Sequence, residues 1–392
     1  MKPLFVNHTA ELGGAELELL DHAKAYPLGK VVFFAEGPLV ESLRGEGVDA
    51  VVLKTSVDLT QVKRGSLAGL SPAGVLGLFR LALDVAKLAR GYDVIFANTQ
   101  KAFLIGALAG RLAGRPVVWR LHDIMSAEHF GLGNRKLMTT AANLFAARVL
   151  ANSQATAAAF VEGGGRASIT QVIHNGIDPD LFVSQAASNV REVLGIGNAP
   201  LVGCFSRLSP WKGQQVLLEA LVRVPGTHAL LVGGALFGEE DHQASLRERA
   251  VHLGIDDRVH FLGFRRDIPA LMLACDVVAH TSVAAEPFGR VIVEGMLAGK
   301  PVIATRAGAA PEIIEDRRSG LLVTPGDADA LAGALLELQH HPEAAVRLAQ
   351  QGRERANAMF TLPTILQQFA NGLLELRVPV SQAAPVLPSR SA

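Results

Sequence analysis

The sequence is poor in cysteine, tryptophan, tyrosine and charge. Its 392 residues include two of each of these three residue types, and Asp, Glu, Lys and Arg together make up 19% of the chain. Cys204 and Cys275 both lie in apolar, strand-like runs, which favours two core thiols over a disulfide or a metal pair. A fold stapled by disulfides is therefore excluded, and this cysteine usage is typical of a reducing compartment.

Long apolar runs are also missing. No run approaches the roughly 20 residues of a membrane-spanning helix, and the segment Met1–Asn7 enters a strand without the apolar stretch of a signal peptide. We therefore expect a cytoplasmic protein, with a position at the inner face of the cell membrane as a further option. The chain does have 49% hydrophobic residues, over a length that suits two domains of roughly 180 residues each.

The formal net charge is zero, but the charge is unevenly distributed. Residues 62–150 hold twelve Lys and Arg against four Asp and Glu, so this basic segment carries +8 and the rest of the chain −8. Leu76 and Phe79 lie beside Arg80 in a helical pattern, which favours peripheral contact with an anionic membrane. A helix packed on the sheet with a solvated basic edge remains the alternative. No nucleic-acid motif is present, so we expect no nucleic-acid partner.

Short Val/Ile/Leu runs alternate with Ala/Leu-rich helical stretches. Strands are predicted near residues 3–7, 31–35, 50–53, 93–97, 116–121, 148–152, 170–174, 200–206, 228–233, 258–263, 276–281, 301–305 and 321–324. Apolar strands separated by helices are typical of parallel sheets buried on both faces, so we predict an α/β fold with two doubly wound, Rossmann-like domains. The periodicity is interrupted after Asp178, and we place the domains at residues 1–185 and 186–358, followed by a helix over 359–377 and a disordered tail over 378–392.

Polar residues follow several of the predicted strands. They comprise Gly13 and Gly14 after the first strand, His122 and Asp123, Ser206 and Arg207 with Lys212, and His280, Thr281 and Ser282. Ligands of open α/β sheets bind at the carboxyl ends of strands. Arg207 can hold a phosphate with its planar guanidinium while Lys212 adds a point charge, which suits a diphosphate. Each residue taken singly is better explained as structural or solvated than as part of a site, and only their convergence favours a site.

The segment Glu286-Pro-Phe-Gly-Arg-Val-Ile-Val-Glu294 contains two carboxylates separated by a turn and the start of a helix. Pro287 and Gly289 break the preceding strand, so Glu286 is expected in a loop and Glu294 within the helix. A loop carboxylate can accept hydrogen bonds from sugar hydroxyls and a helical one from a ribose diol, while the helix N-terminus offers amides to phosphate. A surface helix with two solvated acids, or a strand through the β-branched run, remains the alternative.

Five motifs together resemble the retaining glycosyltransferases of family four. They are Gly13-Gly14-Ala15-Glu16, His122-Asp123, Asn175-Gly176-Ile177-Asp178, the run from Ser206 to Gly213, and Glu286-Pro-Phe-Gly with Glu294. The resemblance covers residues 2 to about 375 and implies the GT-B fold, in which two Rossmann-like domains face a cleft and the last helix packs back on the first domain. Two positions depart from the family pattern, because Ser206 and Ala309 stand where glycines are common.

The resemblance also implies a role for each matching residue. Arg207 and Lys212 would bind the donor diphosphate, Glu294 the ribose, and Glu286 the donor sugar, with Phe288, Gly289, Arg290 and Val291 completing the donor site. Gly14 would approach the donor phosphate or the acceptor, and Gly13 and His122 would contact the acceptor. We count His122, Glu286, Arg207 and Lys212 as catalytic. The implied partners are a UDP- or GDP-linked sugar and a glycan or lipid-linked acceptor, with no cofactor and no metal.

Other classes of protein would need other motifs. A nicotinamide oxidoreductase would need Gly-x-Gly-x-x-Gly after the first strand, and a P-loop enzyme would need Ser or Thr after Gly299-Lys300, where Pro301 stands. A hydrolase using the two carboxylates is disfavoured once Glu294 is assigned to ribose. A sugar-nucleotide epimerase and a catalytically silent binding protein of the same fold stay open. The Asp-x-Asp pairs that begin at Asp178 and Asp327 are expected in a turn and a helix cap, not in a metal site.

Overall fold

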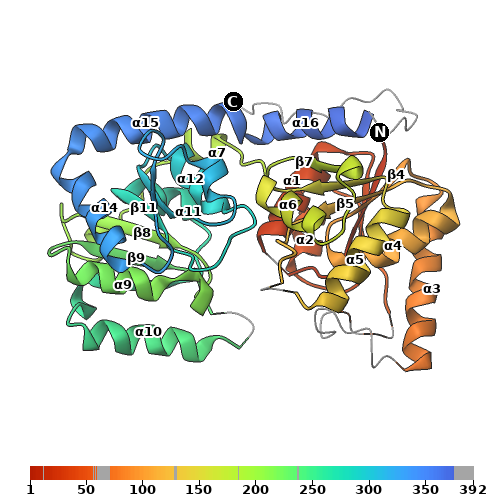
Figure 1. Ribbon diagram of the computed structural model, residues 1–392, viewed down its shortest axis with the longest axis horizontal. Coiled ribbons are helices and arrows are strands. Elements are labelled where there is room, and N and C mark those ends of the chain that lie inside the picture. Colours follow the sequence, from red (N-terminus) through yellow and green to blue (C-terminus); the bar gives the residue numbers. More distant parts are fainter. Residues whose placement is uncertain are drawn as a thin grey trace. The chain divides into compact units, whose positions relative to one another are not determined.

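Two parallel β-sheets organise the computed structural model, which describes residues 1–11, 13–55, 57, 59, 71–127, 130–183, 185–235 and 238–374 (Figure 1). Each sheet is the centre of its own unit. Unit 1 consists of Met1–Gly176 and the segment that starts at Leu362, and unit 2 consists of Ile177–Thr361. The predicted tail over 378–392 lies outside the described residues.

Seven strands in the order β3-β2-β1-β4-β5-β6-β7 form the sheet of unit 1, and every neighbouring pair is parallel. The strands are β1 Pro3–Asn7, β2 Lys30–Phe33, β3 Ala50–Val52, β4 Val94–Ala97, β5 Val117–Leu121, β6 Arg148–Ala151 and β7 Thr170–Val172. All residues of β1, β4 and β5 are buried, as expected of strands covered on both faces. The strand order reverses between β1 and β4, where this type of sheet opens a crevice for ligands.

Helices cover both faces of this sheet (Figure 1). They are α1 Gly14–Ala25, α2 Pro38–Gly45, α3 Pro72–Ala89, α4 Gln100–Ala113, α5 Leu132–Phe145, α6 Gln154–Glu162 and the 3₁₀ turn η1 Ala167–Ile169. Ser71, Thr99 and Ser153 cap α3, α4 and α6, because each hydroxyl accepts a hydrogen bond from the amide three residues on. Trp119 on β5 stacks on Phe103 of α4 in the core of one face.

Unit 2 is built on six parallel strands in the order β10-β9-β8-β11-β12-β13. The strands are β8 Leu201–Phe205, β9 His228–Val232, β10 Val259–Gly263, β11 Val277–His280, β12 Val302–Thr305 and β13 Leu321–Val323. The helices are α7 Asp180–Val183, α8 Val190–Val193, η2 Pro210–Lys212, α9 Gln214–Val222, α10 Glu240–His252, η3 Asp256–Arg258, α11 Ile268–Ala274, α12 Arg290–Leu297, α13 Ala310–Ile313, α14 Ala328–His340 and α15 Pro342–Met359. The reversal of strand order lies between β8 and β11.

The last described helix, α16 (Leu362–Leu374), belongs to unit 1 although it follows unit 2 in the chain. It packs on α1, and Phe369 meets His22 and Phe96 edge-on at ring centroid separations of 4.5 and 5.0 Å. At the other junction unit 2 begins at Ile177, before the boundary expected at residue 185, because α7 packs on α11.

The sequence predicts the fold class correctly. An observed strand overlaps each of the thirteen predicted segments, with β2 starting one residue earlier than predicted, and both doubly wound sheets are confirmed. Cys204 and Cys275 are free and buried, as predicted. No helix in the described part of the chain is long and apolar enough to cross a membrane.

Candidate functional site

The predicted donor-site residues gather at the strand reversal of unit 2. Ser206 and Arg207 leave the carboxyl end of β8, and Lys212 ends η2 just before α9. Thr281 and Ser282 leave the carboxyl end of β11, the strand next to β8. Two connections that run apart at neighbouring strand ends open the space in which doubly wound sheets bind their ligands.

Glu286 is the most densely contacted residue of this group. Its Oε2 accepts hydrogen bonds from Nε2 of His280 at 2.8 Å and from the Ser282 hydroxyl at 2.7 Å. Its Oε1 pairs with the ammonium of Lys212. The side chains of Glu286 and Lys212 are 13% and 15% exposed, so both remain within reach of a ligand.

Two glycines bring the backbone close enough to build this arrangement. Gly213 has a φ of 71°, and a Cβ there would overlap the carbonyl oxygen of Thr281. The hydroxyl of Thr281 donates a hydrogen bond to the Lys212 carbonyl. Gly308 has a φ of 58°, and a Cβ there would overlap the backbone of Glu286. Both positions combine a left-handed backbone with a close approach, so any larger side chain would displace Lys212 or Glu286.

The surroundings of Glu286 keep its carboxyl ionised. Burial alone would raise the pKa of this group, but the charge of Lys212 and the hydrogen bond from His280 outweigh burial and hold the pKa far below its usual range. Glu286 is therefore an acceptor of hydrogen bonds at every pH near neutrality.

Lys212 and Arg207, the predicted diphosphate ligands, each have a carboxylate partner. The Lys212 ammonium also lies 4.1 Å from the ring centroid of Trp211. Nε of Arg207 lies 3.5 Å from Oε2 of Glu239, and Oε1 of Glu239 accepts a hydrogen bond of 2.5 Å from Ser209. Glu239 was not anticipated from the sequence, because it directly precedes α10, far along the chain from Arg207.

Residues 286–297 form the predicted loop and helix, and the strand alternative is wrong. Gly289 precedes α12 with a φ of 88°, and no side chain caps the helix, which leaves amides of its first turn to a ligand. Glu294 lies inside α12 with Oε1 at 3.6 Å from Nε of Arg290. Burial raises the pKa of Glu294, and Arg290 only partly offsets this rise. Phe288 is buried, while Arg290 and Val291 are half-buried.

Ala309, one of the two departures from the family pattern, has an ordinary φ of −82°. Its amide donates to the carbonyl of Glu286 at 3.0 Å. This amide thus supports the loop that carries Glu286. Ser206, the other departure, accepts a hydrogen bond from Gln214, which also donates to the Arg207 carbonyl.

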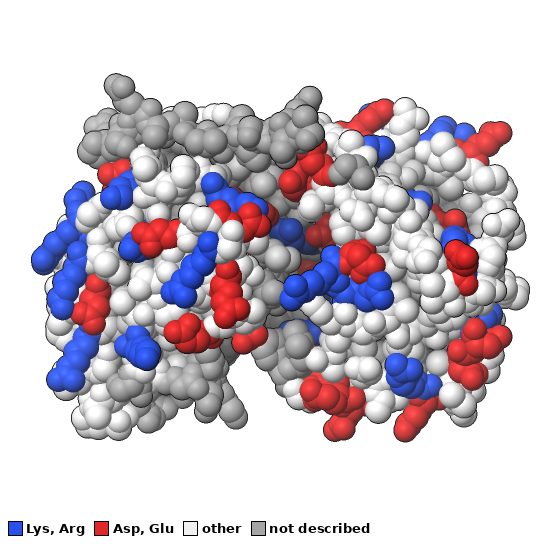
Figure 2. All heavy atoms as spheres, turned by 180° about the vertical axis from the view of Figure 1, so that it is seen from behind, with Lys and Arg blue, Asp and Glu red and all other residues white. Residues whose placement is uncertain are grey.

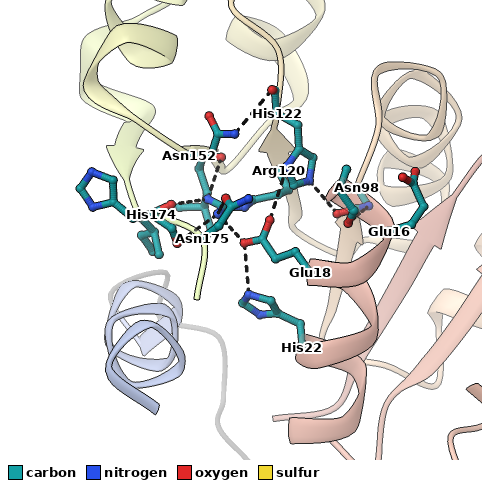
Figure 3. A network of polar contacts seen from close by, with 12 residues as sticks. Glu16, Glu18, His22, Asn98, Arg120, His122, Asn152, His174 and Asn175 are labelled. Atoms are coloured by element: carbon teal, nitrogen blue, oxygen red, sulfur yellow. Dashed lines mark hydrogen bonds and ion pairs between the residues drawn. The ribbon is translucent and has the colours of Figure 1, made fainter. Parts of the chain in front are cut away.

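A second group of predicted residues lies at the strand reversal of unit 1, where Figure 3 shows a buried polar network. His122 follows β5, and its Nε2 lies 2.9 Å from Oδ1 of Asn98, at the end of β4. Its Nδ1 lies 3.4 Å from Oε2 of Glu18 on α1. Asn98 donates to the carbonyl of Ala15, which orients its oxygen toward His122 and assigns the proton to Nε2.

Glu18 is held by Arg120, whose guanidinium approaches it to 2.5 Å. Arg120 also donates to the Ile173 carbonyl at 2.6 Å and to Oδ1 of Asn175 at 3.0 Å. Burial would raise the pKa of Glu18, but Arg120 and the nearby histidines outweigh it and hold this pKa far below the usual range. Asn175, part of a predicted motif, therefore supports the network that orients His122.

The two predicted glycines of unit 1 lie at the start of α1. Gly13 precedes the helix in an extended conformation with a φ of −142°, and no side chain caps the helix. A Cβ on Gly13 would come within 2.8 Å of the carboxylate of Glu16, and the φ of Gly13 is not that of a left-handed turn. Burial raises the pKa of Glu16, whose Oε1 accepts from Asn7 at 3.3 Å.

The predicted residues thus fall into one group in each unit. Arg207, Lys212, Glu286 and Glu294 with their neighbours belong to unit 2, and Gly13, Gly14 and His122 to unit 1. Both Asp-x-Asp pairs have local partners: Oδ1 of Asp178 accepts from the Asp180 amide, and Asp327 caps α14. Within the described ranges, no group of three or more His, Cys, Asp or Glu side chains could hold a metal ion.

Two protein-family models match the chain. Residues 187–355 match the family described as glycosyl transferases group 1, and residues 38–181 match the glycosyltransferase family 4 model. The first match spans most of unit 2 and the second most of unit 1.

Curated relatives and solved structures agree with this match. A GDP-mannose-dependent α-(1-6)-phosphatidylinositol monomannoside mannosyltransferase of Mycolicibacterium smegmatis is 32% identical over 67% of this chain and 71% of its own length. The chain spans 60% of the length of the Mycobacterium tuberculosis relative of the same name. HepE of Anabaena, solved with UDP and glucose, is 43% identical with a TM-score of 0.87 over 95% of this chain and 99% of its own, and it is also solved with UDP-glucose.

Proposed function

The chain belongs to family four of the glycosyltransferases, and we propose that it moves a sugar from a nucleoside diphosphate sugar to a glycan or lipid-linked acceptor with retention of the anomeric configuration. The observation that carries this proposal is the ionised Glu286 paired with Lys212 at the strand reversal of unit 2. A fixed acceptor for sugar hydroxyls beside a cation for phosphate is the combination that a nucleotide sugar needs.

We infer that the donor is a UDP-linked hexose. HepE, which binds UDP and UDP-glucose, resembles this chain at 43% identity over nearly its full length, whereas the GDP-mannose-dependent relatives resemble it at 32% over shorter stretches. In this proposal Arg207 and Lys212 bind the two phosphates of the donor. Glu286 accepts a hydrogen bond from a sugar hydroxyl, and Glu294 accepts hydrogen bonds from the ribose diol.

The transfer follows from these roles. Arg207, Lys212 and the first amides of α12 stabilise the negative charge that develops on the departing diphosphate. The diphosphate itself takes the proton of the acceptor hydroxyl, so that the new bond forms on the face that the nucleotide leaves. We also propose a catalytic role for His122 of unit 1, whose Nε2 proton is directed at Asn98.

Incubation with UDP-glucose, UDP-galactose, UDP-N-acetylglucosamine and GDP-mannose, each with and without a polyprenyl diphosphate-linked glycan, tests this function. NMR of the product anomeric proton reports the stereochemistry. We expect acceptor-dependent release of UDP and an α-linked product from an α-linked donor. A converted donor sugar without acceptor would support the epimerase alternative, and tight nucleotide binding without turnover would support the silent binding protein.

We also propose that the transfer needs no divalent metal. The aspartates that could form an Asp-x-Asp site are used locally, in a turn at Asp178 and in the N-cap of α14 at Asp327. Arg207 and Lys212 supply the positive charge that a bound cation would otherwise bring to the diphosphate.

Activity is therefore expected to survive metal stripping and excess EDTA with less than a twofold change in kcat. The control is a reaction in which Mg²⁺ is added back to the same stripped sample. If turnover disappears in EDTA and returns only with Mg²⁺ or Mn²⁺, the proposal of a metal-free donor site is wrong.

A contact with anionic lipid is the partner that we propose for the basic segment. Its helices α3, α4 and α5 pack side by side and expose large apolar side chains, namely Val75, Leu76, Phe79, Leu108, Leu112, Leu132, Leu137, Leu144 and Phe145. The exposed Arg80, Arg111 and Lys136 lie on the same helices, and Figure 2 shows Lys and Arg side chains gathered along one edge of unit 1. Apolar side chains among cations suit the interface of an anionic bilayer.

Binding to vesicles is expected to rise with their content of anionic lipid and to fall with salt. Each basic residue near such a surface contributes about 1 kcal/mol, so the double variant Arg80→Glu and Arg111→Glu should bind at least tenfold more weakly in a sedimentation assay. Arg353→Glu, a charge reversal of an exposed arginine of unit 2, serves as the matched control. Equal binding to neutral and anionic vesicles would favour the solvated-helix alternative.

A further inference from the structure

His280 and Ser282 both donate hydrogen bonds to Glu286, and the proposed function assigns no role to either residue. His280 ends β11 and is 5% exposed, and Ser282 is 1% exposed, so neither side chain presents a surface to a ligand. Both donate to the same atom, Oε2 of Glu286, at 2.8 and 2.7 Å. Because a carboxylate oxygen offers two lone pairs, these two donors saturate Oε2.

The other oxygen is in a different position. Oε1 contacts the Lys212 ammonium, and this is its one partner among the described residues. One lone pair of Oε1 is therefore left to accept a hydrogen bond, next to the cation. The two oxygens of one carboxylate are thus distinguished by their donors: Oε2 has two donors, whereas Oε1 has the Lys212 ammonium alone among the described residues.

The groups around His280 keep it in this orientation. Nδ1 of His280 lies 3.5 Å from the Thr305 hydroxyl, and this hydroxyl donates to the Ser282 carbonyl at 2.7 Å. Thr305 therefore ties the histidine to the loop that carries Ser282. The ring cannot turn its Nε2 away from Glu286 without breaking contacts on both sides.

We propose that His280, assisted by Ser282, is a positioning residue that makes Glu286 recognise a single hydroxyl of the donor sugar, through Oε1. This inference rests on the proposed function and specifies its donor site further. A carboxylate that is free to rotate would offer either oxygen to neighbouring hydroxyls of a hexose and would discriminate poorly among donors. An anchored one offers one acceptor at a fixed place, so the position of that hydroxyl decides which sugar is accepted.

The first test compares His280→Ala with His280→Gln. Glutamine can place its amide nitrogen close to the position of Nε2 and so restore the donor, whereas alanine cannot. We expect kcat/KM for the donor to fall about 10- to 100-fold in His280→Ala and to recover most of this loss in His280→Gln. The matched control is His228→Ala, which removes a half-buried histidine of β9 that does not contact Glu286. Equal losses in the alanine and glutamine variants would overturn the proposal.

The second test follows the pH dependence of kcat/KM. Among the described residues, Lys212 on η2 and His280 on β11 are titratable groups that contact Glu286, and the thiol of Cys204 on β8 lies near enough to feel its charge. The pKa of this carboxyl is lowered in the folded protein, so Glu286 takes up a proton and loses its role as an acceptor only as the pH falls through that low value. Removing the donor raises the pKa, and the acid limb of His280→Ala should therefore begin at a higher pH, while His280→Gln keeps the wild-type limb. An unchanged acid limb in His280→Ala would overturn the proposal.

The third test measures binding of a panel of monodeoxy donor sugars to the wild type, to His280→Ala and to Ser282→Ala. Ser282→Ala is the milder variant, in case His280→Ala does not fold. Calorimetry measures how much each sugar adds to the binding of the nucleoside diphosphate. In the wild type we expect one deoxy position to lose most of this increment, and in either variant we expect the loss to spread over two or more positions. If the wild type depends on one sugar hydroxyl and both variants keep this selectivity, the role of His280 and Ser282 is contradicted, while the proposed function stands. If no sugar adds to the affinity of the nucleoside diphosphate, the proposed function fails as well.

Discussion

Arg207→Ala and Lys212→Ala are each expected to lower kcat/KM by roughly 30- to 900-fold, because each removes a charged contact to the departing diphosphate worth about 2–4 kcal/mol. The melting temperature of Arg207→Ala should change little, since the Arg207 side chain is 29% exposed and its ion pair with Glu239 adds little to folding. That of Lys212→Ala should fall, because Glu286 loses the charge that offsets its burial. Steady-state kinetics at saturating acceptor and differential scanning fluorimetry on the same samples measure the two effects.

Glu239→Gln is the informative control, because it should act in the opposite direction. The glutamine keeps an oxygen for the Ser209 hydroxyl but withdraws the negative charge beside Arg207. We expect nucleoside diphosphate to bind roughly two- to fivefold more tightly. Near-normal turnover in the double variant of Arg207 and Lys212 would refute the assignment of the phosphate site.

Replacing the two glutamates should separate the nucleotide from the sugar. Glu294→Ala is expected to weaken binding of the nucleoside diphosphate and of the intact nucleotide sugar about 10- to 100-fold alike, because two hydrogen bonds to the ribose diol are lost. Glu286→Ala should not weaken binding of the nucleoside diphosphate, because Lys212 loses its anionic partner, but should remove most of the affinity that the sugar adds. Isothermal titration calorimetry with both ligands measures this difference.

Glu294→Gln and Glu286→Gln serve as matched variants, since each retains one amide oxygen as an acceptor. Glu286→Gln also leaves Lys212 without an anionic partner, so part of the lost affinity for sugar should be offset by stronger attraction for phosphate. If both alanine variants lose the two ligands in equal proportion, the division of roles between the glutamates is wrong.

The strand ends could be predicted because local patterns of apolar residues followed by polar residues indicate them. Continuous apolar runs such as Leu201–Phe205 become buried parallel strands, and the polar residues that follow, Arg207 among them, lie at the carboxyl edge by the geometry of the sheet. The helix that holds Glu294 was also foreseeable, from Pro287 and Gly289 before it. Sequence order thus indicates which residues share one edge of a sheet.

The partners of these residues were not foreseeable, since they depend on contacts between distant segments. Glu18 on α1 meets His122 after β5, and Glu239, just before α10, meets Arg207 after β8. Nothing in the local sequence distinguishes these two glutamates from solvated acids on a helix. The partner of Ala309 could not be predicted either. Its backbone conformation is ordinary, and only the structure shows that its amide donates to the Glu286 carbonyl.

The packing of α16 on unit 1 has a consequence for biosynthesis. Phe369 completes an aromatic cluster with Phe96 and Tyr26, yet it leaves the ribosome only after all of Ile177–Thr361. Unit 2, which is a continuous segment, can therefore finish folding while unit 1 still exposes the apolar surface that α16 will cover. The nascent chain should need chaperone protection at its N-terminal half for longest, because emergence of α16, not synthesis of residue 176, completes that half.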